Sequence, residues 1–343
     1  MHESGVPSYD RIQLAHGSGG LLMRDLIERL FLRHLDSPEL AQLDDAAELT
    51  LESQAIAFTT DTFVVKPIFF PGGDIGGLAV SGTVNDLLMK GARPWCLSLG
   101  LILEEGFPMA HLERILESIR RTCNLAGVRV VTGDTKVVGR GEADGVYINT
   151  AGLGYILPGV TVGGANARDG DAVIVSGAVG RHGVAVMAER HGLHLRSPVR
   201  SDAMPLTGIV VPLLEHFPRV VHVLRDPTRG GMAATLNEIA AQSRAGMVIT
   251  ESAVPVDDNV TAVCDLLGFD PFYLPCEGRF IAIVESAAAG DILAFLTSLD
   301  GCTEPALIGN VTCDPPGEVH LLTTAGSRKL LDLPTGELLP RIC

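Results

Sequence analysis

The sequence has 343 residues, of which 46% are hydrophobic and 20% charged, with 39 glycines and a formal net charge of −15. This length favours two domains, and the composition excludes a disordered chain in favour of a compact, glycine-rich enzyme with helices and strands. The negative charge and the lack of any lysine or arginine run argue against binding nucleic acid through its phosphates, whereas a nucleotide bridged by a divalent cation is compatible with an acidic chain.

The first half of the chain alternates predicted helices and strands. A glycine-rich turn at residues 16–20 opens onto a helix in which apolar residues recur at helical spacing from Leu22 to Phe31. After it we expect a strand at 55–60, a helix at 78–90, a strand at 95–103, a helix at 109–123, and strands at 128–132 and 147–156. Residues 158–170 are rich in glycine and suit a linker, so we place a domain boundary near residue 160.

The second half repeats this mixture. We expect strands at 172–176, 220–224, 247–250, 280–284 and 306–310, and helices near 183–191, 231–244 and 287–299. From about Leu331 prolines favour an extended path that reaches up to about 40 Å. The predicted organisation is therefore an N-terminal domain at 1–160, a C-terminal domain at 161–330 and a mobile tail at 331–343 that carries Cys343.

The seven cysteines are widely separated, and none belongs to a C-x-x-C pair. This pattern fits neither a disulfide framework nor a zinc cage, and it indicates a reducing, cytoplasmic compartment. Residues 1–10 lack a basic-then-apolar targeting signal, and no stretch approaches the roughly 18–20 apolar residues of a membrane span. We therefore expect a cytoplasmic protein without a membrane segment.

Aspartates recur where predicted strands end and helices begin. Taken one at a time, such residues commonly cap helices and start turns. Several acids that approach from different loops, however, repel each other unless a cation lies among them, and magnesium binds a few carboxylates together with phosphate oxygens. The sequence therefore predicts a site for a metal ion and a triphosphate. The predicted metal ligands are Asp44, Asp45, Asp61, Asp86, Asp134 and Asp226.

Four other features are weaker signals. The turn at 16–20 can present backbone N–H groups to a phosphate, although it is neither a P-loop nor a dinucleotide fingerprint. Lys136 is either a phosphate or carbonyl contact or a solvated loop lysine. Glu277 precedes a predicted strand, where its side chain can face a cleft, but by itself it is better explained as a surface glutamate. Cys343, on a proline-stiffened tail, is either a thiol that carries a substrate group or a cysteine without a special role.

Together, and in order along essentially the whole chain, these motifs closely resemble the HypE family of [NiFe]-hydrogenase maturation proteins. The aspartate motifs are shared with the wider superfamily of aminoimidazole ribonucleotide synthetase, selenophosphate synthetase and thiamine-monophosphate kinase, whereas the ending Pro340-Arg341-Ile342-Cys343 is the narrow signal. The motifs that carry the resemblance are residues 16–20, Asp44-Asp45-Ala46-Ala47, Thr60-Asp61, Asn85-Asp86, residues 132–137, residues 226–231 and the ending.

The resemblance implies both a fold and an activity. The fold is α/β to α+β, a two-domain PurM-like architecture with mixed sheets flanked by helices and an extended C-terminal tail. The protein is expected to form a homodimer with ATP near the domain and subunit junction. A carbamoyltransferase partner, HypF, loads the thiol of Cys343, and the protein then uses ATP and Mg²⁺ to dehydrate the thiocarbamate to a thiocyanate. The HypC–HypD complex accepts the cyano group, which becomes an iron ligand.

The resemblance also implies roles for individual residues. Cys343 carries the substrate group, and Lys136 and Glu277 handle the carbamoyl nitrogen and its protons. Arg341 is expected to neutralise the terminal carboxylate. The predicted nucleotide contacts are His16, Gly17, Ser18, Gly19, Asp61, Thr62, Asn85, Asp86, Gly133, Asp134, Thr135 and Asp226.

Two alternative functions stay open at this point. One is an ATP-dependent kinase or synthetase of the same superfamily that acts on a free small molecule, with Cys343 incidental. The other is a carrier without enzymatic activity, in which Cys343 and nearby acids move a metal ion or cyanide between partners. A kinase acting on a free small molecule should stay active after removal of Cys343, whereas a dehydratase acting on Cys343 should not. ADP formation coupled to a change at Cys343 would exclude a pure carrier.

Overall fold

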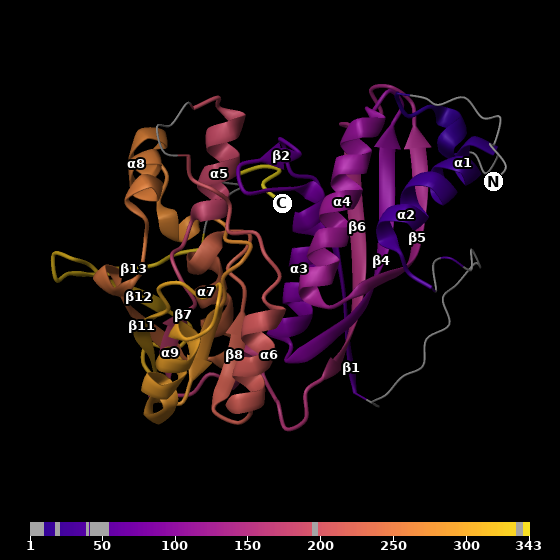
Figure 1. Cartoon of the computed structure of the whole chain (residues 1–343). Helices are drawn as coiled ribbons and strands as arrows, with labels where there is room; N and C mark the ends of the chain where they lie inside the picture. Colours follow the sequence, from indigo (N-terminus) through magenta and orange to yellow (C-terminus); the bar gives the residue numbers. More distant parts are fainter. Residues whose placement is uncertain (1–9, 18–20, 39–40, 42–54, 194–197, 334–338) are drawn as a thin grey trace.

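The computed structural model describes residues 10–17, 21–38, 41, 55–193, 198–333 and 339–343. In Figure 1 the two halves of the chain form layered units that lie side by side, with the end of the chain between them. Each unit is built on a mixed sheet with helices packed against it. None of the helices in these residues is both long and apolar enough to cross a membrane.

The first half builds a four-stranded sheet in the order β1-β6-β4-β5, in which only β4 and β5 are parallel. The described elements of this half are η1 (Leu14–Gly17), α1 (Leu21–Leu26), the π-helical η2 (Ile27–Phe31), α2 (Leu32–Leu35), β1 (Ile56–Phe63), β2 (Phe69–Phe70), β3 (Gly73–Asp74), α3 (Ile75–Met89), β4 (Ala92–Glu104), α4 (Met109–Ala126), β5 (Arg129–Val138) and β6 (Val146–Ile156). Most of them agree with the predicted elements to within a few residues, but β2 and β3 were not predicted, β5 runs six residues beyond the predicted end at 132, and the first helix contains a π-helical turn.

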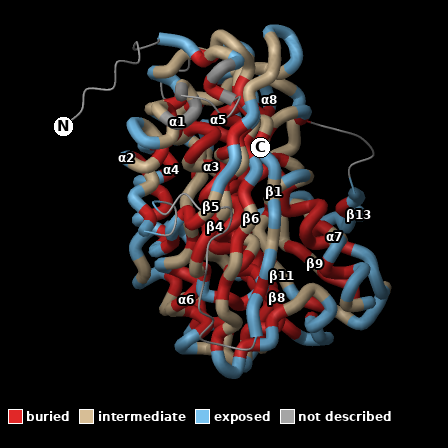
Figure 2. Tube along the Cα trace, turned by 90° about the vertical axis from the view of Figure 1, so that its right-hand side faces the viewer, coloured by how far each residue is buried: buried red, intermediate tan, exposed pale blue. Residues whose placement is uncertain are grey.

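Helices α3 and α4 cover one face of this sheet. The opposite face is largely exposed: in Figure 2, β1 runs along the near side mostly in pale blue and tan, and Phe58 is 69% exposed. Ile102 of β4 is 43% exposed. A monomeric protein rarely leaves apolar side chains on an uncovered sheet face, so this face is suited to contact with another surface.

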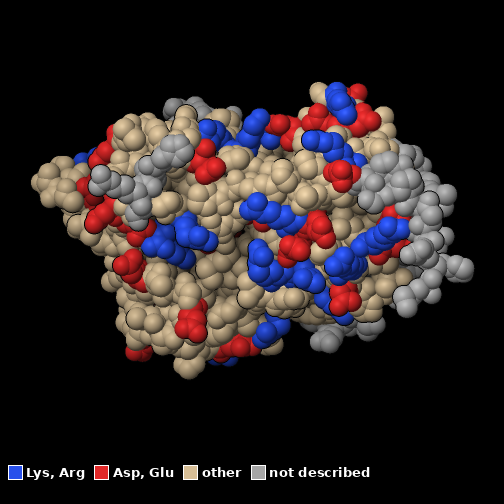
Figure 3. Space-filling view, turned by 45° about the horizontal axis from the view of Figure 1, so that its top comes forward, with Lys and Arg blue, Asp and Glu red and all other residues tan. Residues whose placement is uncertain are grey.

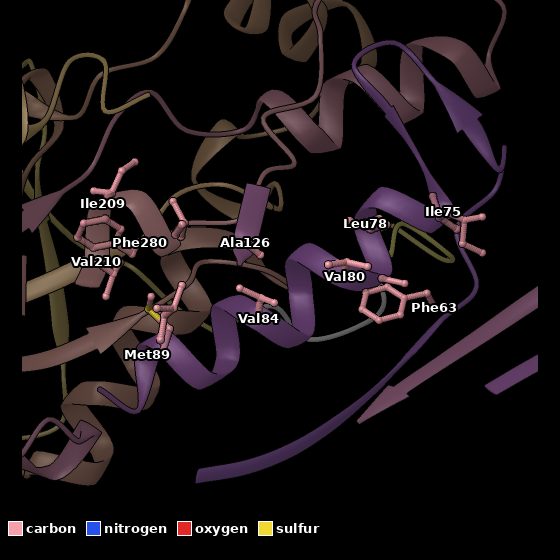
Figure 4. Packing of buried hydrophobic residues seen from close by; sticks show 14 of the residues in the cluster. Phe63, Ile75, Leu78, Val80, Val84, Met89, Ala126, Ile209, Val210 and Phe280 are labelled. Carbon is pink, nitrogen blue, oxygen red and sulfur yellow. The ribbon is translucent and has the colours of Figure 1, made fainter. Parts of the chain in front are cut away.

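Helix α3 begins at Ile75, three residues before the predicted start, because the Asp74 side chain caps it. Asp74 Oδ1 accepts hydrogen bonds from the N–H groups of Gly76 at 2.9 Å and Gly77 at 3.0 Å. The helix is buried on nearly all sides, as expected for a central helix. Figure 4 shows its side chains Leu78 and Val84 within a packed cluster that includes residues of both halves, and this cluster forms one continuous core.

The second half builds a seven-stranded sheet in the order β13-β12-β9-β11-β7-β10-β8, with β12 and β9 parallel. Its elements are η4 (Gly164–Asn166), β7 (Ala172–Val175), α5 (Arg181–Arg190), α6 (Thr207–His216), β8 (Val221–Arg225), α7 (Gly231–Ser243), β9 (Gly246–Thr250), η5 (Glu251–Ala253), α8 (Asp258–Leu267), η6 (Pro271–Tyr273), β10 (Ile281–Val284), η7 (Ser286–Ala288), α9 (Ala289–Thr297), β11 (Ala306–Thr312), β12 (Val319–Leu322) and β13 (Arg328–Leu330).

Besides the short 3-10 helices, two α-helices and two strands of this half were not predicted: α6, α8, β12 and β13. Helix α6 contains Pro212 and an apolar run without clear helical spacing, and α8 is a single short helix of ten residues. Strand β13 is exposed at every position, so it has no alternation of apolar and polar side chains. Helix α8 and strand β12 do show a periodic pattern, with Val260, Val263 and Cys264 buried at helical spacing and alternate burial along β12, but each is short, and α6 and β13 show no such pattern.

Candidate active site

A cavity of about 100 Å³ lies where the two halves of the chain meet. The residues around it come from β1, from α3, from the segment after β8, from the segment before β10 and from the end of the chain. They are Thr60, Asp61, Phe63, Gly82, Asp86, Asp226, Thr228, Arg229, Glu277 and Cys343. Three of the predicted metal ligands, Glu277 and Cys343 therefore lie together, although they are far apart in the sequence.

Strand alternation and one glycine bring the first two acids together. Asp61 and Phe63 point to the helix side of β1, because neighbouring side chains alternate between the two faces of a strand. At Gly82 of α3, an added Cβ would lie 2.8 Å from the Phe63 ring and 3.5 Å from an Asp61 carboxylate oxygen. Without that Cβ, β1 can approach the helix, and Asp86 follows one turn later, where it accepts a hydrogen bond of 2.9 Å from the Thr59 hydroxyl.

The third acid, Asp226, lies on a loop pressed against the segment that carries Glu277. Gly231 has a φ of 61°, and an added Cβ there would lie 2.6 Å from the Leu274 carbonyl oxygen. The N–H of Cys276 donates to the Pro227 carbonyl at 2.9 Å. Pro227 thus supplies an acceptor that holds the loop, and Asp226 is kept close to Glu277.

Burial raises the pKa of each carboxyl side chain in the cavity, and the charge of neighbouring acids adds to this for Asp86, Asp226 and Glu277. The pKa of Asp226 rises to about 7, first through burial and then through the charge of Asp86. Burial is also the main cause of the raised pKa of Asp61 and of Asp86. The pKa of Glu277 is raised well above its usual value, by burial and then by Asp226. Among the described residues, Glu277 Oε1 is buried without a hydrogen-bond partner.

The only cationic side chain lining this cavity among the described residues is Arg229. Its pKa is raised first by Cys343 and then by the nearby acids. One arginine facing four carboxyl groups leaves the cavity short of positive charge, which suits a divalent cation with phosphate oxygens. In the described residues, no three His, Cys, Asp or Glu side chains are already arranged as a metal site. The donor chemistry fits magnesium, and phosphate oxygens and water would complete the coordination.

Asn85, predicted to contact the nucleotide, instead joins the two halves of the chain. Its Nδ2 donates to the carbonyl oxygens of Met204 at 3.1 Å and Glu277 at 3.4 Å, and its Oδ1 accepts from the Leu206 N–H at 2.8 Å. The side chain is buried, and these bonds use both N–H donors and the carbonyl oxygen of its amide. Asn85 therefore fixes the backbone of Glu277 relative to α3.

Thr62 is exposed on β1, next to Asp61, whereas the other described predicted contacts lie at the opposite edge of the four-stranded sheet. Thr62 and Asp134 belong to one row across β1, β6, β4 and β5, so three strand spacings, roughly 14 Å, separate them. Lys136 Nζ lies 2.8 Å from Asp134 Oδ2, and both side chains are mostly exposed. Gly133, Asp134, Thr135 and Lys136 lie on β5, against which η1 with His16 and Gly17 packs.

The structure thus divides the predicted site into two groups. The cavity group comprises Asp61, Asp86, Asp226, Glu277 and Cys343, and the β5 group comprises Gly133, Asp134, Thr135 and Lys136 together with the nearby His16 and Gly17. Within one chain the β5 group does not line the cavity. The predicted residues Ser18, Gly19, Asp44 and Asp45 lie outside the described residues.

The end of the chain is seated in the protein's own cleft. The N–H groups of Val64 and Lys66 donate to the carbonyl oxygens of Cys343 and Arg341, each at 3.1 Å, and Leu339 and Ile342 are buried. Burial is the main cause that raises the pKa of the Cys343 thiol to about 12, followed by the charge of Glu277.

The expectation for Arg341 was wrong. Its guanidinium group hydrogen-bonds the Asp144 carboxylate and donates at 2.9 Å to the Val64 carbonyl, so it anchors the tail. Lys66 also bonds Asp144, at 2.9 Å. The cation that faces the Cys343 sulfur is Arg229, which the sequence analysis placed in a motif without assigning it a role. The signal that could have found it is its position three residues after Asp226 in a predicted acidic site.

Two family models match the chain: "AIR synthase related protein, N-terminal domain" over residues 43–156, and its C-terminal counterpart over residues 168–321. The fold and the acid-lined cavity thus define a two-domain protein of the AIR synthase related, PurM-like class, as predicted. The chain is 46% identical to carbamoyl dehydratase HypE of Azotobacter vinelandii over 332 residues, which is 97% of each chain. It belongs to the HypE family.

Solved structures of this family agree with the fold. The hydrogenase maturation protein HypE in complex with ATP superposes with a TM-score of 0.93 at 47% identity, covering 96% of this chain and 99% of that one. A HypE chain from a HypE–HypF complex has a TM-score of 0.80 at 41% identity, covering 90% of this chain and 99% of that one.

Proposed function

We propose that this protein is an ATP-dependent carbamoyl dehydratase that converts S-carbamoylated Cys343 to a protein thiocyanate, which supplies the cyanide ligands of the [NiFe]-hydrogenase iron centre. The observation that carries the proposal is the position of the Cys343 thiol, inside a cavity lined by carboxyl groups and Arg229. The 46% identity to a carbamoyl dehydratase over nearly the full length supports the same conclusion.

The reaction removes the carbamoyl oxygen and two N–H protons from the thiocarbamate, which leaves a carbon–nitrogen triple bond on sulfur. Bound ATP with Mg²⁺ supplies the phosphoryl group that turns the oxygen into a phosphate leaving group. Asp61, Asp86 and Asp226 would hold the metal ion, because its positive charge would offset the burial and mutual repulsion that raise the pKa values of Asp86 and Asp226 and the burial that raises the pKa of Asp61. Glu277, buried next to the sulfur, is positioned to exchange protons with the carbamoyl nitrogen.

The active form in this proposal is a homodimer. The cavity, at about 100 Å³, is far smaller than the roughly 300–1,000 Å³ of typical ligand sites and has room for a carbamoyl group but not for a nucleotide. The predicted phosphate contacts lie on and near β5, on the sheet whose open face exposes Phe58 and Ile102. A second copy packed on this face would bring its Asp134 and Lys136 to the first copy's cavity, with ATP between them.

Further parts of the proposal follow from the family resemblance. HypF loads Cys343, in line with the HypE–HypF complex solved for a relative, and the HypC–HypD complex accepts the cyano group. The reaction takes place in the cytoplasm. Domains at 1–160 and 161–330 and a tail at 331–343 would give the cysteine the reach to serve both the partner and its own cavity.

The test is the intact mass of the C-terminal peptide. The protein is incubated with the carbamoyltransferase and carbamoyl phosphate, and then with or without hydrolysable ATP and magnesium. We expect carbamoylated Cys343 to lose the mass of one water only when ATP is present. An unmodified Cys343 alongside phosphorylation of an added small molecule would replace the dehydratase with a kinase, and a change at Cys343 without ADP formation would indicate a carrier.

A further inference from the structure

The seated tail is held largely through its main chain. Arg190, at the end of α5, donates from Nη1 to the Pro340 carbonyl at 2.8 Å and from Nη2 to the Arg341 carbonyl at 2.7 Å. The same guanidinium group donates from Nε at 2.8 Å and from Nη2 at 2.6 Å to the carbonyl of Lys66, which belongs to the segment that pairs with the tail. One side chain thus joins the tail to its docking segment.

His182, at the start of the same helix, holds the next carbonyl. Its Nε2 lies 2.8 Å from the Ile342 carbonyl oxygen, and its Nδ1 lies 2.8 Å from the Ser201 hydroxyl. A carbonyl can only accept, so Nε2 carries a proton, and the hydroxyl of Ser201 can donate to Nδ1. Burial lowers the pKa of His182, in agreement with this neutral form. The ring is fully buried and packs edge-on against Phe70, so its direction is fixed.

Under the proposed function, on which this inference rests, Cys343 must occupy two places. In the seated tail the half-buried Cys343 places its thiol in a cavity of about 100 Å³, which is too small to admit the active-site groups of another protein, and burial raises the pKa of the thiol to about 12, so that it is almost wholly protonated. Loading therefore requires the tail to leave, and dehydration requires it to return in the same register. The contacts that hold the tail decide between these two states.

We propose that His182 and Arg190 form a latch that holds the peptide carbonyls of residues 340–342 and thereby registers Cys343 in the cavity. They are positioning residues, since neither lines the cavity nor contacts the sulfur. Because the latch binds main-chain groups, it acts on the free tail and on the carbamoylated tail alike. Its release frees the thiol for the partner, and its closure presents the thiocarbamate for dehydration.

The test is the rate at which iodoacetamide alkylates Cys343 in the full-length chain, measured by mass on the C-terminal peptide. The exposed Cys313 of the same sample is the internal reference. Arg190→Ala should raise the ratio of Cys343 to Cys313 alkylation about tenfold or more, because it removes several charged hydrogen bonds from the seated tail. His182→Gln, which keeps a side-chain N–H donor, should raise it less than His182→Ala.

A matched control lies on the same helix. Arg181→Ala removes an arginine that pairs with Asp257 and does not touch the tail, so it should leave the ratio within about twofold of the original protein if α5 itself stays intact. The latch would be overturned if Arg190→Ala left the ratio of Cys343 to Cys313 alkylation unchanged. It would also be overturned if Arg181→Ala and Arg190→Ala raised this ratio equally.

A second measurement uses chains already carbamoylated at Cys343. Arg190→Ala should slow single-turnover dehydration while the partner loads it at least as fast as the original protein. A defect of equal size in both steps would contradict the latch. If the original protein itself fails to dehydrate Cys343, the proposed function fails, whereas the alkylation ratios still judge the latch independently.

Discussion

At the residue scale, the cavity brings together carboxyl groups whose ionisation is unfavourable. Asp61, Asp86, Asp226 and Glu277 share a small volume with Arg229, and the pKa of each acid is raised. Raised carboxyl pKa values mean that ionising the site near neutral pH destabilises the folded chain. Catalytic and ligand sites commonly destabilise the free protein, and the bound ligand restores the lost stability. Here the ligand that would do so is a cation.

Asp226→Asn should therefore stabilise the unliganded protein at pH 8 by about 2 kcal/mol and much less at pH 5. The pKa of Asp226 is about 7 in the folded chain, against a usual value of 3.8. Ionisation of Asp226 therefore destabilises the folded state progressively as the pH rises between these two values, and the loss is complete above about 7. Thermal unfolding at both pH values measures the effect.

The exposed Asp300→Asn should show no such difference. An Asp226→Asn protein that is less stable than the original protein at pH 8 would contradict the argument. Magnesium with ATP should reduce the difference in stability between the Asp226→Asn variant and the original protein, since the ligand stabilises the original protein more than the variant.

At the element scale, α3 determines how closely β1 approaches. Its N-terminal cap by Asp74, its burial on nearly all sides and its Asn85 clamp hold it between the two halves, and Gly82 is the point of closest approach to Phe63. Helix propensity alone favours alanine over glycine in a helix by up to about 1 kcal/mol, so this glycine is retained for packing.

Gly82→Ala should destabilise the protein by about 1–2 kcal/mol despite the gain in helix propensity, because the added methyl group meets the fully buried Phe63 ring. Chemical denaturation gives the free energy of unfolding. Gly290→Ala in α9, where the added Cβ meets nothing within 4 Å, is the matched control and should be neutral or stabilising. Adding Phe63→Leu to Gly82→Ala should recover part of the loss. A stabilised Gly82→Ala protein would show that β1 is free to move away.

At the scale of the whole molecule, the two groups of predicted site residues lie at opposite edges of one sheet. The row that joins Thr62 to Asp134 crosses four strands, and Asp61 faces the other side of the sheet. Figure 3 shows Lys and Arg side chains interleaved with Asp and Glu across the middle of one face of the molecule, so positive and negative charges alternate on this face. One copy of the chain alone does not bring Lys136 to Cys343.

Mixed dimers test whether a second copy does so. A dimer of one Lys136→Ala chain and one Glu277→Gln chain should regain dehydration at one of its two sites, although each variant alone is inactive. Single-turnover mass measurement on tagged, co-expressed chains follows Cys343 of each. The matched control is a dimer of the original chain with a Lys136→Ala/Glu277→Gln chain, which should be inactive if the groups act across the interface. Activity in that control and none in the first dimer would place both groups within one chain.

Much of this arrangement could be predicted from the sequence, and the exceptions have physical causes. Helix α4 shows its buried face in the spacing of its apolar residues, and the recurring aspartates predicted the acid cluster, although Asp61 lies within β1 and Asp86 within α3 and only Asp226 follows a strand. The separation of Asp134 from Asp61 was not predictable, since it depends on β6 and β4 lying between β5 and β1. His182 and Arg190 bind main-chain carbonyls of a distant segment, and such recognition leaves no motif.

The main-chain character of the tail contacts has an evolutionary consequence. The contacts that His182 and Arg190 make with residues 340–342 are to carbonyl oxygens, which every amino acid has. Drift in the identity of residue 340 would therefore leave these bonds in place. Insertion or deletion of a single residue before Cys343 would displace the sulfur by roughly 3.3 Å, about one residue of extended chain, while the carbonyls stayed bound. A change in the length of this segment should thus be tolerated less well than a change at residue 340, whereas residues 341 and 342 are also held through the Arg341 side chain and the buried Ile342 side chain.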